Sequence, residues 1–316
     1  MTGRSGEAFD ASLVEAFGRD RVGRDVRLAP LTTFKVGGPA DWLIETRSDA
    51  ELQQALRLAR QAGVPVTMLG GGSNVLVGDR GVRGLVIRPR GGSIVEERPG
   101  RLRAAAAVTI NGLVRWTVGR GLAGLEAWAG TPGTVGGGIY GNAHYGGRLL
   151  GDLVEEVRVV GPGGDLHDLP QAAMEFGYDR SRLQRSGEVL LSAVFRVVPG
   201  DSERLRATAR QSLAFRKRTQ PLESPSAGCI FQNPDPAVDR VPAGLPPSAG
   251  ALVDRAGLKG RMVGGARVSP THGNFIVNDG RASAADIRAL VELCRHEVRE
   301  RFGVTLKDEI VCVGEF

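Results

Sequence analysis

Lysine, cysteine and aromatic residues are scarce in this sequence of 316 residues. Only four of its 41 basic residues are lysines, only three residues are cysteines, and Phe, Trp and Tyr together make up 5%. A nucleic-acid-binding surface usually combines a basic stripe with interleaved aromatic side chains. Here the basic residues are spread along the chain and aromatic rings are few, so we do not expect nucleic acid as a partner.

The three cysteines, Cys229, Cys294 and Cys312, are widely spaced and form no metal-ligand pattern. An odd number of separated cysteines is typical of a reducing compartment. The first 17 residues lack the apolar core of a signal peptide, and no hydrophobic run reaches the ~18 residues of a membrane span. We therefore expect a cytoplasmic protein without a membrane span. The histidines show no ligand spacing, so we expect no metal.

Glycine is the abundant residue. The 46 glycines amount to about twice the usual ~7%, and they cluster at 70–72, 136–138 and 146–147. Clustered glycine indicates backbone that turns sharply or approaches a ligand closely. The hydrophobic share of 41% and charged share of 24% are those of a globular protein, and the net charge of +6 suits anionic ligands.

The first 90 residues alternate between strand and helix patterns. A Ser48 or Asp49 cap predicts a helix that ends at Gly63, and strands are expected at 41–46, 64–69, 75–77 and 84–89. Neither G-x-G-x-x-G before a helix nor G-x-x-x-x-G-K-[ST] occurs, which excludes the common dinucleotide and P-loop sites.

The rest of the chain reads as an α+β pattern with one long glycine-rich loop. We expect a strand and helix over 102–121, a loop over 124–147, a hairpin over 154–169, a strand over 189–200, a helix through Leu205, Ala209 and Leu213, a boundary near 219, a capped helix over 283–302 and a final strand over 304–313. Cys294 on the helix and Cys312 in the final strand are expected in the core.

Two glycine turns can cradle a diphosphate. GGGSN (70–74) and GTPGTVGGG (130–138) each present consecutive backbone N–H groups beside hydroxyl or amide side chains. Such nests bind anions without side-chain charge. Two of them suit the diphosphate of a dinucleotide, although two tight turns without a ligand remain an alternative.

At this point the motifs resemble a known family. TTFKVGGPADWLIE near residue 32, GGGSN, GLEAWAGTPGTVGGGIYGNAHYG, SAGCIFQNP, AGLKG, GGARVSPTHGNFIVN and FGVTLKDEIVCVG occur in this order. The pattern resembles the UDP-N-acetylenolpyruvoylglucosamine reductases, flavoenzymes that form UDP-N-acetylmuramate for bacterial peptidoglycan. The resemblance runs from about residue 28 to the end, and the compact form is similar to the shorter of the family's two subtypes.

The resemblance implies an α+β fold with an FAD-binding part of the p-cresol methylhydroxylase/vanillyl-alcohol oxidase type. It implies an FAD domain at 1–206 in two lobes (about 1–84 and 85–206), a smaller α+β substrate domain at 207–303, and a C-terminal strand, 304–316, that returns to the FAD side. It further implies non-covalent FAD, NADPH as hydride donor and UDP-N-acetylglucosamine enolpyruvate as substrate. The oligomeric state stays open, with a monomer favoured.

The resemblance also implies three catalytic residues. Cys229 takes the place of the family's proton donor, which is usually serine; a thiol of ordinary pKa, ~8.5, is mostly protonated at neutral pH and can donate. The family usually has Tyr-Arg-x-Ser where this chain has Tyr178-Asp179-Arg180-Ser181, so Arg180 is the expected enolate-stabilising cation and Arg182 the alternative. Glu309 is expected to orient the protonation, working together with Arg180.

Binding residues follow from the same motifs. For FAD we expect Gly70, Gly71, Gly72, Ser73, Asn74, Thr131, Pro132, Gly133, Thr134, Gly136, Gly137 and Asn142. For the substrate we expect Tyr178, Arg216, Asn233, Lys259, His272 and Asn274. A solvated helix end is the alternative for Arg216, and a structural role is the alternative for His272.

Two other functions remain to be separated from the reductase. One is another flavin oxidoreductase of the same fold that acts on a small alcohol or sugar. The other is a non-catalytic nucleotide-binding protein, which would be colourless and would not turn over NADPH.

Overall fold

The computed structural model describes residues 4–316, which form two compact units. Unit 1 consists of the chain up to Arg24, Trp42–Gly71 and Gly84–Phe215; unit 2 consists of Asp25–Asp41, Gly72–Arg83 and Arg216–Phe316. The functional division expected from the sequence stays a prediction. None of the helices in the described residues combines the length and apolar character that a bilayer crossing requires.

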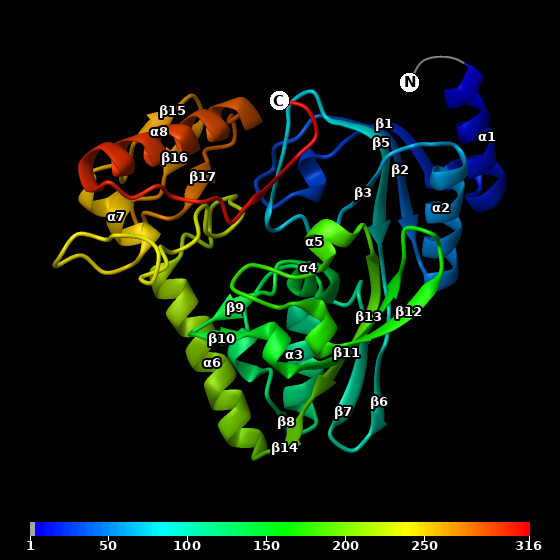
Figure 1. The fold of residues 1–316 in the computed structure, drawn as a ribbon, viewed down its shortest axis with the longest axis horizontal. Helices are drawn as coiled ribbons and strands as arrows, with labels where there is room; N and C mark the ends of the chain where they lie inside the picture. The colour runs from blue at the N-terminus through cyan, green and yellow to red at the C-terminus, as the bar shows by residue number, and fades with distance from the viewer. Residues whose placement is uncertain (1–3) are drawn as a thin grey trace. The chain divides into compact units, whose positions relative to one another are not determined.

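Unit 1 is mixed α and β (Figure 1). Its helices are α1 (Arg4–Phe17), α2 (Asp49–Gln61), α3 (Ile110–Gly119), α4 (Val135–Tyr140) and α5 (Leu183–Ser186), with short 3-10 turns η1 (Arg19–Arg21), η3 (Glu126–Trp128), η4 (Leu150–Leu153) and η5 (Gln171–Met174). Its strands are β3 (Val66–Met68), β6 (Ile94–Arg98), β7 (Arg101–Ala105), β8 (Leu122–Ala123), β9 (His144–Tyr145), β10 (Arg148–Leu149), β11 (Val154–Val160), β12 (Leu166–Pro170), β13 (Val189–Arg196) and β14 (Val198–Pro199). Four elements contain a point at which the chain changes unit, namely β1 (Val22–Arg27), β2 (Pro39–Thr46), β5 (Val82–Pro89) and α6 (Ser202–Thr219).

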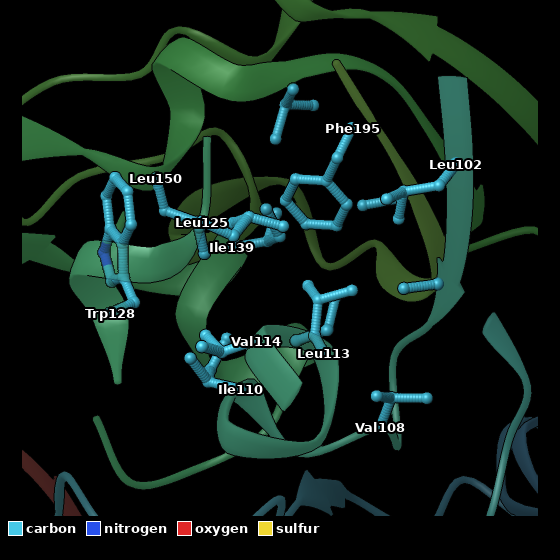
Figure 2. Close-up of a cluster of buried hydrophobic side chains, with 14 of the residues drawn as sticks. Leu102, Val108, Ile110, Leu113, Val114, Leu125, Trp128, Ile139, Leu150 and Phe195 are labelled. Carbon is cyan, nitrogen blue, oxygen red and sulfur yellow. The ribbon is translucent and has the colours of Figure 1, made fainter. Parts of the chain in front are cut away.

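An antiparallel sheet of order β12-β11-β13-β7-β6 carries the main core of unit 1. Thr109 caps α3 by accepting the Gly112 N–H, and the buried side chains of that helix recur on one face. They pack with sheet residues such as Leu102 and Phe195, as Figure 2 shows. The start of α3 is thereby fixed against the sheet.

A second sheet has the order β1-β2-β5-β3, in which β3 and β5 run parallel. Helix α2 belongs to the core cluster of this part, as its sequence predicts. Ser48 accepts the Glu51 N–H, and Leu52, Ala55 and Ala59 are buried on one face. Strand β3 ends two residues before Gly70, and the Leu69 N–H between them donates to Ile87 O of β5 (2.9 Å), so this sheet positions the first glycine turn.

Unit 2 contains η2 (Ala29–Leu31), β4 (Val75–Val77), α7 (Ala249–Arg255), β15 (Met262–Val263), β16 (Ala266–Val268), β17 (Ile276–Asn278), α8 (Ala284–Phe302) and β18 (Val311–Val313). Helix α8 begins with the predicted capping box of Ser283 and Asp286 and ends at Gly303, whose φ is +71°. The Asp79 carboxylate also accepts hydrogen bonds from the N–H groups of Ala284 and Ala285, so these N–H groups in the first turn of α8 have acceptors. Burial raises the pKa of the Cys294 thiol in α8 to about 12, and its core position is confirmed.

Two expectations from the sequence are wrong. The final strand covers only Val311–Val313, paired in parallel with β4, and Cys312 is exposed instead of buried. Alternating apolar residues predict a strand but not whether a neighbouring layer covers it. The second error is the loop expected over 124–147, which contains helix α4. Glycine occurs inside this helix because the space is tight: a Cβ on Gly138 would come within 3.1 Å of side-chain atoms of Leu150 and Ile110.

Candidate functional site

A pocket of about 710 Å³ lies within unit 1. Four separate segments line it: Gly70–Gly71, the stretch from Arg88 to Ile94, the start of α3 with the residues before it, and Gly133–Thr134. Its volume is in the range of small-molecule and cofactor sites. Hydrogen bonds from Ile110 N–H to Gly133 O (3.0 Å) and from Val135 N–H to Val108 O (2.8 Å) join the third and fourth segments.

Backbone donors are concentrated in this pocket. The N–H groups of Gly70, Gly71, Gly133 and Thr134 find no acceptor within residues 4–316, although every one of these residues lines the pocket. A buried or half-buried N–H normally has a partner. Four such donors around one concavity form a nest for an anion such as a diphosphate.

Only glycine fits where the two turns meet. A Cβ on Gly71 would lie 2.8 Å from the Gly133 Cα, and a Cβ on Gly70 would lie 2.7 Å from the Thr134 hydroxyl oxygen. Gly133 itself has a φ of +93°, which favours glycine. The close approach of the backbones therefore explains the sequence of both turns.

Arg88 adds a cation that the sequence analysis did not select. Its Nη1 donates to Glu45 Oε1 at 3.0 Å, whereas its Nε is buried and finds no hydrogen-bond partner among the described residues. A buried donor of this kind, on a residue that lines the pocket, is available to an oxygen acceptor that enters it. Arg90 and Trp116 line the same pocket and were also missed. The only sequence signal was RPRGG, which begins with the last two residues of β5 and continues into a pair of glycines.

A tight turn in unit 1 presents Tyr178 and Arg180. Gly177 and Arg180 exchange backbone hydrogen bonds (3.0 and 3.2 Å), and Asp179 between them has a φ of +51°. The buried Asn142 clamps this turn, because its Nδ2 donates to Gly177 O and its Oδ1 accepts the Gly151 N–H. The amide of Asn142 is thus used within the protein.

His144 lies beside the same turn. Its Nε2 is 3.2 Å from Asp179 Oδ1, and its ring lies 4.6 Å from that of Tyr178. The carboxylate directly after Tyr178 therefore faces an imidazole within unit 1, while the Arg180 side chain is exposed.

The two candidate arginines differ in their partners. Arg182 donates from Nε and Nη2 to both oxygens of Glu188, at 2.8 and 3.0 Å. This two-pronged pair lowers the pKa of the Glu188 carboxyl and raises that of Arg182. Arg180 has no carboxylate partner in the part of the chain that the structure describes. The geometry thus favours Arg180 as the cation available to a ligand.

In unit 2, one buried amide organises the loop that carries Cys229. Asn274 accepts the Phe231 N–H at its Oδ1 (2.9 Å) and donates from Nδ2 to Phe231 O (2.7 Å), while its backbone oxygen accepts the Ile230 N–H. The Glu309 N–H donates to Ile230 O at 2.8 Å. The half-buried Cys229 and Glu309 therefore lie on stretches of backbone that Ile230 joins, whereas the predicted cooperation of Glu309 with Arg180 stays a prediction.

His272 has a structural role in this arrangement. Its Nδ1 accepts the Asn274 N–H, and its ring packs edge-on against Phe275. Burial, and secondly the Lys259 charge, lower the pKa of His272, so the ring is neutral at neutral pH.

The remaining substrate candidates are placed as follows. Arg216 is buried, whereas its neighbours Lys217 and Arg218 are exposed, so Arg216 is not a solvated helix end. Asn233 accepts the Ala249 N–H at the start of α7, and Lys259 forms a 2.7 Å ion pair with Asp254. The roles of Asn233 and Lys259 toward the substrate stay predictions.

Relatives of known identity match both parts of the chain. Residues 40–170 match the family model described as "FAD binding domain", and residues 220–313 match "UDP-N-acetylenolpyruvoylglucosamine reductase, C-terminal domain". A reductase of that name from Synechococcus sp. (strain JA-3-3Ab) is 40% identical over 97% of this chain and 95% of its own length. One from Heliobacterium modesticaldum is 38% identical over 94% and 93%.

The chain belongs to the UDP-N-acetylenolpyruvoylglucosamine reductase family. The crystal structure of the Thermus caldophilus reductase agrees, with a TM-score of 0.77, 34% identity, and coverage of 93% of this chain and 99% of that one. The expected α+β class with an FAD-binding fold is confirmed.

The pocket residues fit the FAD of this reductase family. The nest and Arg88 offer donors for the diphosphate, and the close contact between the two glycine turns holds the nest together. Of the predicted FAD residues, Gly70, Gly71, Gly133 and Thr134 line the pocket.

The other predicted FAD residues lie elsewhere in the two units. Thr131 and Pro132 precede the turn. The N–H groups of Gly136 and Gly137 donate to Ala106 O and to the Thr134 hydroxyl. In unit 2, the oxygen of Gly72 accepts from Thr33, Ser73 follows, and the Asn74 amide donates to Glu309 O. The roles of these residues toward FAD stay predictions.

The glycine contact gives a direct test of the pocket. Gly71→Ala should weaken FAD binding by about tenfold or more, because the new methyl group must displace the Gly133 backbone and so disturb the nest that binds the diphosphate; a tenfold loss is about 1.4 kcal/mol of binding free energy. The affinity is measured by titrating apoprotein with FAD and following flavin fluorescence.

Gly119→Ala is the matched control, because no atom lies within 4 Å of its added Cβ and its backbone is helical. An affinity of Gly71→Ala equal to that of this control would contradict the assignment of the pocket to FAD.

Proposed function

We propose that this chain reduces UDP-N-acetylglucosamine enolpyruvate to UDP-N-acetylmuramate, with NADPH as the hydride donor and non-covalently held FAD as the carrier. Relatives matched over nearly the whole chain carry the name of this reductase, and the pocket of unit 1 fits its cofactor. The observation that carries most weight is the set of four partnerless N–H groups around that pocket. It supports a bound dinucleotide independently of the family relationship.

When bound at the nest and Arg88, FAD would supply the redox chemistry that links NADPH to C3 of the enolpyruvyl group. The chain must then stabilise the negative charge that develops on the substrate carboxylate as an enolate, and it must provide a proton for C2. We assign the enolate to the Arg180 guanidinium and the proton to the Cys229 thiol. Glu309, anchored by its N–H to Ile230 O, orients the protonation.

Binding of the sugar nucleotide is assigned to Tyr178, Arg216, Asn233, Lys259, His272 and Asn274. Asn274 and the neutral His272 act by shaping the loop around Cys229. Arg216 is the cation for the substrate diphosphate, because it is buried whereas its two basic neighbours, Lys217 and Arg218, are exposed.

We propose on the basis of this product that the protein acts in peptidoglycan synthesis, and thereby in cell wall biogenesis, cell shape and cell division. We propose a cytoplasmic location and a monomeric state as the simplest arrangement for this role.

Two half-reactions measured separately test the function. The FAD-loaded protein, reduced by NADPH without oxygen, should be reoxidised by UDP-N-acetylglucosamine enolpyruvate with the formation of one UDP-N-acetylmuramate per flavin, identified by mass spectrometry. Reoxidation only by oxygen after turnover of a small alcohol would favour another flavin oxidoreductase. A colourless protein that binds no flavin would favour a non-catalytic nucleotide-binding role.

Cys229→Ala should leave reduction by NADPH near the parental rate and slow reoxidation by the sugar nucleotide about 10²–10⁴-fold, since only the second step needs a proton at C2. Cys229→Ser should retain substantial activity, because a hydroxyl can also donate a proton. Stopped-flow absorbance of the flavin measures both steps. Cys312→Ala, at an exposed cysteine, is the control, and a Cys229→Ala rate equal to that of the control would remove the role.

Arg180→Ala should slow reoxidation about 10²–10³-fold, the usual effect of removing a donor aimed at a developing oxyanion. Arg182→Ala should instead lower the melting temperature, because Glu188 loses its partner, with a smaller effect on the rate. Single-turnover reoxidation and thermal melts of both variants decide the ranking. The reverse order of rates would transfer the role to Arg182.

A further inference from the structure

Helix α3 turns one face toward the FAD pocket. Gly112 and Trp116, four residues apart and hence on the same side of the helix, both line it. Trp116 is half-buried, and the guanidinium carbon of Arg120 lies 4.0 Å from its ring centroid. Among the described lining residues, Trp116 alone has an aromatic ring.

The position of Trp116 along the helix relates it to the diphosphate nest. Thr109 forms a backbone bridge with Thr134, so the beginning of α3 lies at the nest. At 1.5 Å of rise per residue, Trp116 lies about 10 Å along the helix from Thr109. A ribose can span the distance between a diphosphate at the nest and a planar ring beside Trp116.

FAD has two ring systems, the isoalloxazine and the adenine, and the residues that line the pocket indicate which of them lies there. The isoalloxazine ring must meet the substrate, and Tyr178 and Arg180 of unit 1, which we assign to the substrate, do not line this pocket. Apolar residues that do line it, Ile94, Ala107 and Val108, suit a ring that takes no part in the chemistry. Both observations favour the adenine over the isoalloxazine as the ring in this pocket.

We propose that Trp116 stacks on the adenine ring of FAD and that Arg120, placed over the same indole, holds it in position. The proposal rests on the use of FAD by this chain. It assigns the adenosine half of the cofactor to the surface formed by Gly112, Trp116, Ile94, Ala107 and Val108. Trp116 then contributes to affinity without contributing to the reaction.

Three ligands separate this arrangement from its alternatives. Apoprotein is titrated with FAD and FMN by flavin fluorescence and with ADP by calorimetry, for the parent, Trp116→Ala, Trp116→Phe and Arg115→Ala. Arg115 is the matched control, since it is exposed on α3 and does not line the pocket. Thermal melts of each apoprotein establish that the variants are folded.

Trp116→Ala should weaken FAD and ADP about tenfold or more, the usual effect of removing an aromatic ring from a stacked base, and should leave FMN unchanged. Trp116→Phe keeps an aromatic ring, so its affinity for FAD and ADP should fall less. This variant provides the test if the alanine variant does not fold. Arg115→Ala should match the parent.

Equal FAD and ADP affinities in the parent and both Trp116 variants would overturn the proposal, and so would a loss for FMN as large as that for FAD, which would place the isoalloxazine at Trp116. A parent protein that binds no FAD at all would instead count against the proposed function.

Discussion

The contact between two glycine turns is the constraint on which unit 1 depends. Gly71 meets Gly133 backbone to backbone, and Gly70 meets the Thr134 hydroxyl, at distances that leave no room for a Cβ. Thr134 also caps α4, and Gly133 accepts the first N–H of α3. One close approach thus sets the start of two helices, exposes a group of partnerless donors and fixes the surface that α3 offers to a cofactor.

In unit 2, the side chain of Asn274 holds the loop that carries Cys229. The residues assigned to proton transfer, Cys229 and Glu309, lie on irregular backbone, which regular hydrogen bonding does not hold in place. The buried amide of Asn274 makes two hydrogen bonds to Phe231, and Ile230 bonds both Asn274 and Glu309. A buried amide with both of its polar atoms hydrogen-bonded is costly to disturb, so Asn274 supports this irregular stretch of chain.

Sequence reasoning succeeded where the signal is local. The capping box at Ser283, the cap at Ser48 and the glycine turns are set by neighbouring residues, and all lie where the sequence predicts. Arg88 and Trp116 were missed because their local sequence carries at most the weak signal of RPRGG; only the fold brings their segments to one pocket. Cys312 was misplaced for the same reason, since a strand pattern does not reveal an uncovered strand.

The backbone N–H groups of the nest and the side chain of Arg180 suit ligands that stay bound for different times. Backbone N–H groups carry no ionisable charge and lose no side-chain entropy on binding, so a nest built from them holds a diphosphate constantly across pH. That property fits a cofactor that stays bound through many turnovers. Arg180, on a turn and exposed, pays side-chain entropy each time it orders, which fits a group that meets a new substrate in each cycle. The Arg182 side chain is already ordered by its ion pair with Glu188. The same guanidinium group, two residues after Arg180, therefore contributes to the stability of the fold.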